Sequence, residues 1–170
     1  MAMEGVFELT TPAHLLGKLE REYERWKADP VNSDCAWNFF VTAEHLPDWL
    51  ARSDSQALGG KSINAFKHDR PLLRICSHIA NGGKHFRAKA SVHTSVDRTV
   101  IELRGWVEDG YVEDGYFVKE PMLVVHATSQ EQAALGWDTP DRDALWLATK
   151  VLEFWRHFLA LQSPMEPLDP

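Results

Sequence analysis

The chain has 170 residues, of which 44% are hydrophobic and 25% charged, and its formal net charge is -7. This composition is typical of one globular domain and excludes a disordered chain, a collagen-like repeat and a coiled-coil rod. No apolar run is long enough to span a membrane, and the first residues lack the basic start and apolar stretch of a signal peptide. We therefore expect a cytoplasmic protein whose two cysteines, Cys35 and Cys76, are free thiols.

The first half of the chain is predicted to be helical. Residues 11–28 carry apolar side chains at helical spacing behind a capping Thr11, and residues 34–52 form a second helix that Pro47 should kink or split after His45. A short helix is expected over residues 63–69. A longer one should begin at Pro71 and end near Asn81, where two consecutive glycines offer a stop.

The second half changes to alternating, Val-rich and Tyr-rich segments, which predict three antiparallel strands at residues 88–94, 98–108 and 116–127. The sequence Val-Glu-Asp-Gly-Tyr occurs twice in residues 107–116 and should form the end of a hairpin. A last helix is expected at 141–162, followed by a loose tail at 163–170. The predicted fold is a single α+β domain over residues 1–162, with about four bundled helices and a three-stranded meander inserted before the last helix.

A polar strip is predicted on the helix that begins at Pro71. Arg74, His78 and Asn81 fall on the side opposite the apolar residues, and His85 joins them if the helix continues through the glycines. On the preceding long helix, Asn38 and His45 share one sector. Two facing polar strips would form a site between helices, whereas the alternative is that these groups only fix helix packing.

The chemistry of the strip suggests a phosphate-bearing ligand. A histidine and an arginine can cleave RNA without metal, since the imidazole accepts the 2′-hydroxyl proton and the guanidinium neutralises the phosphate. Residues 61–104 also hold nine Lys/Arg and only three Asp/Glu, although these cations could instead pair with acids of the same chain. The candidate catalytic residues are Arg74, His78 and His85, and the candidate binding residues are Asn38, His45, Asn81 and Lys84.

No cofactor or metal is expected. The Gly-rich phosphate loops of nucleotide-binding proteins are absent, and so is the Gly-x-Ser-x-Gly motif of hydrolases. His45, His78 and His85 together with Glu44 or Asp48 could in principle hold a metal, but the Glu-x-x-His and His-x-x-x-His spacings of helical metal sites do not occur.

The segment Asn81–His85 is predicted to be an anion-binding turn. Two glycines behind a helix end can expose backbone N–H groups, and Lys84 and His85 add a positive charge and a group that titrates near neutral pH. The alternative is an ordinary glycine helix cap with two exposed polar residues.

Three segments carry a resemblance to known proteins: Ala-Trp-Asn-Phe-Phe at residues 36–40, His-Leu-Pro-Asp-Trp at 45–49 and Ile-Ala-Asn-Gly-Gly-Lys-His-Phe at 79–86. They resemble a group of uncharacterised bacterial and phage proteins and, more widely, HEPN-like helical bundles. That resemblance implies a helical fold that binds RNA. In the ribonuclease members an arginine precedes a histidine near a helix end. The interval from Arg74 to His78 is shorter than the interval in those members, so the resemblance implies the fold and RNA binding but not RNA cleavage.

Two functions follow as expectations. The first is a HEPN-like protein that binds RNA or another phosphate-bearing partner. The alternative is a non-catalytic protein-interaction or structural module, such as an antitoxin-like or phage accessory subunit, in which the polar strip only holds helices together. The catalytic interpretation predicts that Arg74, His78 and His85 share an accessible cleft, and the module interpretation predicts that each is bonded to backbone or to an acid. A homo-oligomer is compatible with both.

Overall fold

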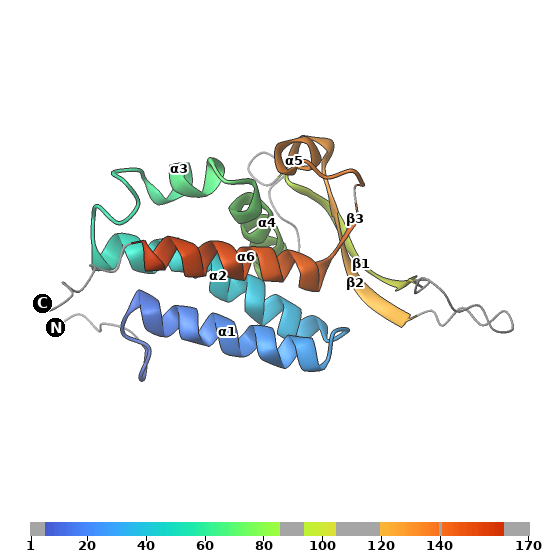
Figure 1. The fold of residues 1–170 in the computed structure, drawn as a ribbon, viewed down its shortest axis with the longest axis horizontal. Helices are drawn as coiled ribbons and strands as arrows, with labels where there is room; N and C mark the ends of the chain where they lie inside the picture. Colours follow the sequence, from blue (N-terminus) through green and yellow to red (C-terminus); the bar gives the residue numbers. More distant parts are fainter. Residues whose placement is uncertain (1–5, 86–93, 105–119, 140, 162–170) are drawn as a thin grey trace, which may run out of the picture.

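The computed structural model describes residues 6–85, 94–104, 120–139 and 141–161, without the side chains of residues 83–85 and 104. In this part the chain is an α+β protein with a bundle of helices at one end and a three-stranded antiparallel sheet at the other (Figure 1). None of its described helices is both long and apolar enough to cross a membrane. The elements in chain order are α1 (Pro12–Ala28), α2 (Ser33–Ser53), α3 (Ile63–His68), α4 (Pro71–His85), β1 (Val96–Arg104), β2 (Glu120–Ala127), α5 (Ser129–Leu135), β3 (Asp141–Asp143) and α6 (Ala144–Ala160).

The helices α1, α2 and α6 pack side by side around an aromatic core (Figure 1). Thr11 caps α1 by accepting the N–H of His14, and Asn32 caps α2 in the same way. Trp26 is fully buried between Phe39 and Phe40, with ring centroids 6.0 and 5.8 Å away, in the tilted and edge-on geometries that aromatic pairs prefer. The apolar stripe expected on residues 11–28 therefore faces the core as predicted.

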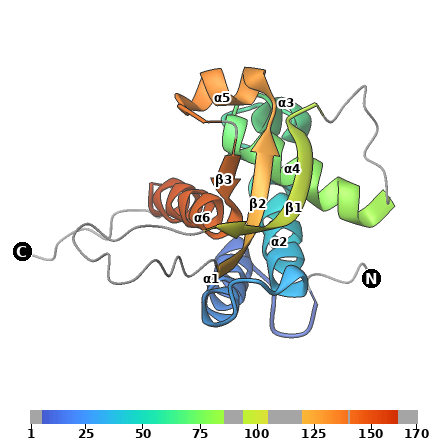
Figure 2. The same cartoon turned by 90° about the vertical axis from the view of Figure 1, so that its right-hand side faces the viewer.

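The sheet has the order β1-β2-β3, so β2 is its central strand (Figure 2). β1 and β2 are antiparallel, with Val100 opposite Val124, and β2 is antiparallel to β3, with His126 opposite Asp141. The register between β1 and β2 shifts by one residue between Val96 and Arg98. α4 and α6 contact the sheet from the bundle side, which joins the two parts of the fold.

The third strand is not the one predicted. The segments expected at 98–108 and 116–127 correspond to β1 and β2, but the remaining strand, Asp141–Asp143, lies at the start of the segment expected to be helical. α6 begins only at Ala144, because the side chain of Asp143 caps it by accepting the N–H of Leu145. The expected strand at 88–94, the hairpin repeat at 107–116 and the tail at 163–170 fall wholly or almost wholly outside the described residues.

Neither the split expected at Pro47 nor the stop expected at Gly82 and Gly83 occurs. α2 continues through Pro47, so the expected split after His45 is absent, because the buried Leu46 and Leu50 on either side of the proline hold this part of the helix against the core. α4 continues through Gly82 and Gly83 to His85. The predicted stop at the glycines is therefore wrong, and the segment Asn81–His85 is helical rather than a turn, whereas its anion binding stays a prediction. The short helix α5, which ends at the left-handed Gly136 (φ 66°), was not predicted.

Replacing the helical Gly82 and replacing the left-handed Gly136 should have opposite effects on stability. Gly82 is helical and an added Cβ would meet no atom within 4 Å, so Gly82→Ala should raise the free energy of unfolding by about 0.5–1 kcal/mol. Gly136 also has open space, but its positive φ is strained for any L side chain, so Gly136→Ala should lower stability by about 1 kcal/mol. Urea unfolding of both variants checks this, and a destabilising Gly82→Ala would contradict a helix at that position.

Candidate functional site

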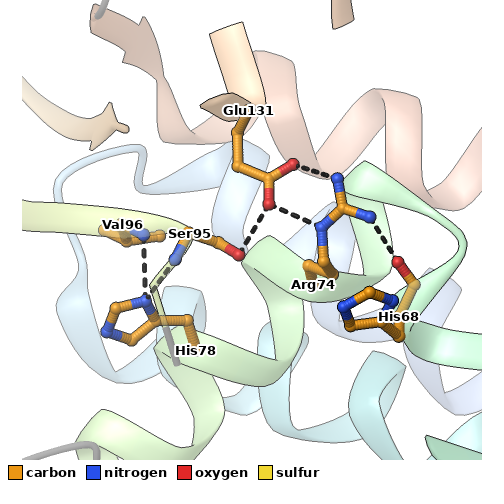
Figure 3. Close-up of polar contacts among 6 residues, drawn as sticks. All are labelled: His68, Arg74, His78, Ser95, Val96 and Glu131. Atoms are coloured by element: carbon orange, nitrogen blue, oxygen red, sulfur yellow. Dashed lines mark hydrogen bonds and ion pairs between the residues drawn. The ribbon is translucent and has the colours of Figure 1, made fainter. Parts of the chain in front are cut away.

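Arg74, the first candidate catalytic residue, is held by a buried acid (Figure 3). Its Nε and Nη2 atoms donate to the two carboxylate oxygens of Glu131 on α5, each at 2.6 Å, and Nη1 donates to the backbone carbonyl of His68. Glu131 is only 2% exposed and also accepts a hydrogen bond of 2.8 Å from the hydroxyl of Ser95. The hydrogen bonds to Glu131 hold the pKa of Arg74 above its ordinary value, although burial acts in the opposite direction. Arg74 thus joins α4 to α5.

His78, the second candidate, caps the beginning of β1 (Figure 3). Its Nδ1 atom accepts the backbone N–H groups of Ser95 at 3.1 Å and of Val96 at 2.9 Å. A ring nitrogen that accepts two N–H donors carries no proton, so this geometry requires Nδ1 to be deprotonated. His78 is therefore bonded to backbone and Arg74 to an acid, as the module interpretation predicts.

The other candidate residues are dispersed. Asn81 donates to the carbonyl of Ser77 one turn earlier on α4. Asn38 and His45 are exposed on α2, while the side chains of Lys84 and His85 lie outside the described part of the chain. Among the described residues, neither His45 nor His78 belongs to a cluster of metal-ligating groups. The structure thus does not bring the predicted strips together into one described cleft.

In the basic segment, residues 61–104, most of the cations that the structure describes are engaged within the chain. Of its described side chains, Lys61 pairs with Asp69, Lys67 with Glu44 and Asp48, and Arg74 with Glu131. Arg70 lies over the ring of Phe66, with its guanidinium carbon 3.7 Å from the ring centroid. The ion pairs of Lys61, Lys67 and Arg74 neutralise positive charge locally, which leaves less of it to attract a polyanion.

A cluster that the sequence did not indicate joins the three strands. Glu102 on β1, the buried His126 on β2 and Asp141 on β3 lie close enough to be considered as metal ligands. The carboxylate of Glu102 lies 3.0 Å from Nε2 of His126, however, and that of Asp141 contacts Nδ1, at the opposite edge of the ring. A metal ion binds only one nitrogen of a histidine ring, so a single ion could not replace the contacts of both Glu102 and Asp141 with His126. This geometry favours hydrogen bonds that hold the three strands together.

An apolar hollow of about 320 Å³ lies between α2, α4 and the β1–β2 face of the sheet. Its walls come from Trp37 and Phe40 on α2, Ile79 on α4, Ile101 on β1 and Leu123 on β2, with further residues Ser33, Ala36, Thr99, Val100, Val124, Val125 and Ala144. Trp37 and Ile101 are large side chains that remain 45% and 61% exposed. Hollows with mainly apolar walls and exposed large side chains at their rim are typical of binding surfaces.

The sequence could not identify this hollow as a site. Trp37 belongs to the segment that carries the family resemblance, but its helical spacing gives no sign that it faces a strand more than 60 residues away. Comparison of the chain with models of protein families, with curated proteins and with solved structures finds no match.

Replacing Arg74 tests its structural role. Arg74→Ala would leave the buried Glu131 without its partner, so we expect the free energy of unfolding to fall by about 3–5 kcal/mol. Arg52→Ala, at an exposed arginine on α2, should stay within about 0.5 kcal/mol of the parent. Thermal or urea unfolding measures both variants, and an Arg74→Ala variant as stable as the control would contradict this role.

Proposed function

We propose that the chain is a non-catalytic protein-interaction module that receives an apolar side chain of a partner in the hollow between α2, α4 and the sheet. The observation that carries this proposal is the hollow itself, with the half-exposed Trp37 and Ile101 at its rim. Partially exposed aromatic residues beside an apolar depression are the usual anchors of protein interfaces.

The contacts of the polar strip support a binding module over an enzyme. A general base needs a free lone pair near its substrate, and Nδ1 of His78 is taken by two backbone N–H groups. An arginine binds phosphate best through two parallel N–H groups, and in Arg74 the pair formed by Nε and Nη2 already binds Glu131. In an antitoxin-like or phage accessory subunit, such a strip would position the helices whose surface binds the partner.

Two matched tryptophan variants test the hollow. Trp37→Ala removes one wall, whereas Trp146→Ala removes a tryptophan of similar exposure on α6 that does not line the hollow. We expect the parent and Trp146→Ala to bind anilinonaphthalene sulfonate and peptides selected by phage display for a bulky apolar anchor. Trp37→Ala should lose about 10-fold or more in affinity, as anchor residues do.

Titration by fluorescence for the dye, and by calorimetry for the selected peptides, gives these affinities. Equal losses in both variants, or selected peptides whose binding is indifferent to Trp37→Ala, would contradict the proposal.

A second candidate function, binding of single-stranded RNA, is favoured by a different surface. Trp137 and Trp146 meet edge-on with centroids 5.8 Å apart, and the guanidinium carbon of Arg142 lies 5.1 and 5.5 Å from their rings. Lys150 lies 5.8 Å from the ring of Trp146. Half-exposed aromatic rings can stack bases. Arg142 and Lys150 pair within the chain with Asp138 and Glu153, but these acids are exposed and such pairs are weak, so the two cations can exchange them for phosphates. This is the RNA-binding function that the HEPN resemblance implies.

Salt dependence and the same two variants separate the candidates. If RNA binds at this corner, affinity for a short single-stranded oligonucleotide should fall steeply as salt rises, because phosphate contacts release counterions. Trp146→Ala should weaken RNA binding about 5-fold or more through lost stacking, and Trp37→Ala should not. Fluorescence anisotropy at two salt concentrations measures this, and absence of binding at low salt would remove the RNA candidate.

A further inference from the structure

β1 is an edge strand of the described sheet. It pairs with β2 along one side, and no described strand pairs with its other side (Figure 2). Near its start, His78 already accepts the N–H groups of Ser95 and Val96, so the open stretch begins at Asp97. Ile101 and Leu103 in this stretch are 61% and 66% exposed. A long edge with exposed apolar residues is a template for pairing with another strand.

The charge pattern of β1 indicates that the strand pairing with its open edge is a second copy of β1. Antiparallel pairing of β1 with a second copy of itself, about a twofold axis at its middle residue Val100, places Arg98 opposite Glu102 of the copy. The same symmetry places Glu102 opposite Arg98 of the copy, so each dimer contains two pairs of opposite charge. Residues directly opposite in an antiparallel pair point to the same face, so each pair can form.

The neighbouring symmetric registers lack this match. An axis at Ile101 would place Arg98 opposite Arg104 of the copy, which are like charges, and an axis at Thr99 would place Arg98 opposite Val100. Within the open stretch, the register at Val100 aligns residues 97–103 with the copy and the register at Ile101 aligns residues 98–104, so overlap alone does not separate these two registers. Charge complementarity therefore selects the register at Val100, and selection of one register is the requirement for a specific pairing.

The two charged groups are suited to a partner. Arg98 is exposed, and no described acid pairs with it within the chain. Glu102 lies on the same face, and its carboxylate contacts Nε2 of His126.

We propose that two copies of this chain join through their β1 strands, antiparallel about Val100, so that the two described three-stranded sheets become one continuous sheet. This dimer goes beyond the proposed function, because its interface is the edge of the sheet rather than the apolar hollow. It also extends the wall of the hollow. Ile101 of the copy lies opposite Thr99, and Thr99 lines the hollow.

Charge reversal tests the pairing. Sedimentation velocity and light scattering of the full chain should show a dimer. Arg98→Glu turns two attractive pairs into two repulsive ones and should weaken the dimer about 10-fold or more. The double variant Arg98→Glu/Glu102→Arg restores opposite charges across the axis and should recover dimerisation. Arg21→Glu, the same charge change at an exposed position on α1, is the matched control and should leave the dimer unchanged.

A cysteine pair tests the register even if the double variant fails to fold. With Cys35→Ser as the background, Val100→Cys places each thiol opposite its own copy, roughly 5 Å apart between Cα atoms, a distance that a disulfide spans. Thr99→Cys is the control, because it would lie diagonally about 7–8 Å from its copy. Under a mild thiol oxidant, Val100→Cys should form a covalent dimer much faster than Thr99→Cys.

A chain that stays monomeric at the highest attainable concentration would overturn the proposal. So would a dimer that Arg98→Glu leaves intact, or equal cross-linking of the two cysteine variants. Dye and peptide binding to the Arg98→Glu variant keeps the two proposals apart: the hollow should still bind when the dimer is lost, and a dimer without binding at the hollow would remove only the proposed function.

Discussion

The buried ion pair between Arg74 and Glu131 is the interaction on which the arrangement of bundle and sheet depends. Glu131 is 2% exposed, and a carboxylate so far from water is tolerable only when a cation and other donors surround it. Arg74 supplies the cation from α4, and Ser95 supplies a hydroxyl at the entrance to β1. One acid thus fixes the positions of α4, α5 and the first strand relative to one another.

His78 extends this junction by one turn of α4. Its acceptance of the Ser95 and Val96 amides fixes the point at which β1 starts, and β1 in turn sets the register of β2. The contacts among Glu102, His126 and Asp141 then run across all three strands. Arg74, His78 and Asn81, the described part of the polar strip of α4, are therefore engaged within the fold, whereas Trp37 and Ile101 leave large apolar side chains open to a ligand.

The hollow and the edge of β1 are suited to binding because apolar side chains remain exposed at both. Trp37 and Ile101 stay half-exposed although their neighbours Phe40 and Leu123 are buried. Exposed apolar side chains gain free energy when a partner removes them from water, whereas a satisfied ion pair such as Arg74–Glu131 gains little from a new partner.

Most of the helices could be predicted from the sequence. Thr11, Asn32 and Pro71 mark helix starts through chemistry that depends on a few neighbouring residues, and the spacing of Leu15, Leu19 and Trp26 identifies the face that is buried. The α+β class followed from the change of period in the second half. Even the polar strip of α4 could be placed correctly on its helix, because Arg74, His78 and Asn81 share one side at helical spacing.

The tertiary structure alone decided what those side chains do. Nothing near Arg74 in the sequence indicates Glu131, 57 residues later on a short helix that local patterns did not reveal. Asp141–Asp143 became a strand because β2 offered an open edge, and α4 continued through two glycines although glycine favours a helix end. Local propensities differ by only about 1 kcal/mol between residue types, so the sequence by itself determined the helices and strands only where propensity and periodicity agree. Contacts between residues far apart in the chain decided which side chains pair, the order of the strands and which apolar side chains stay exposed.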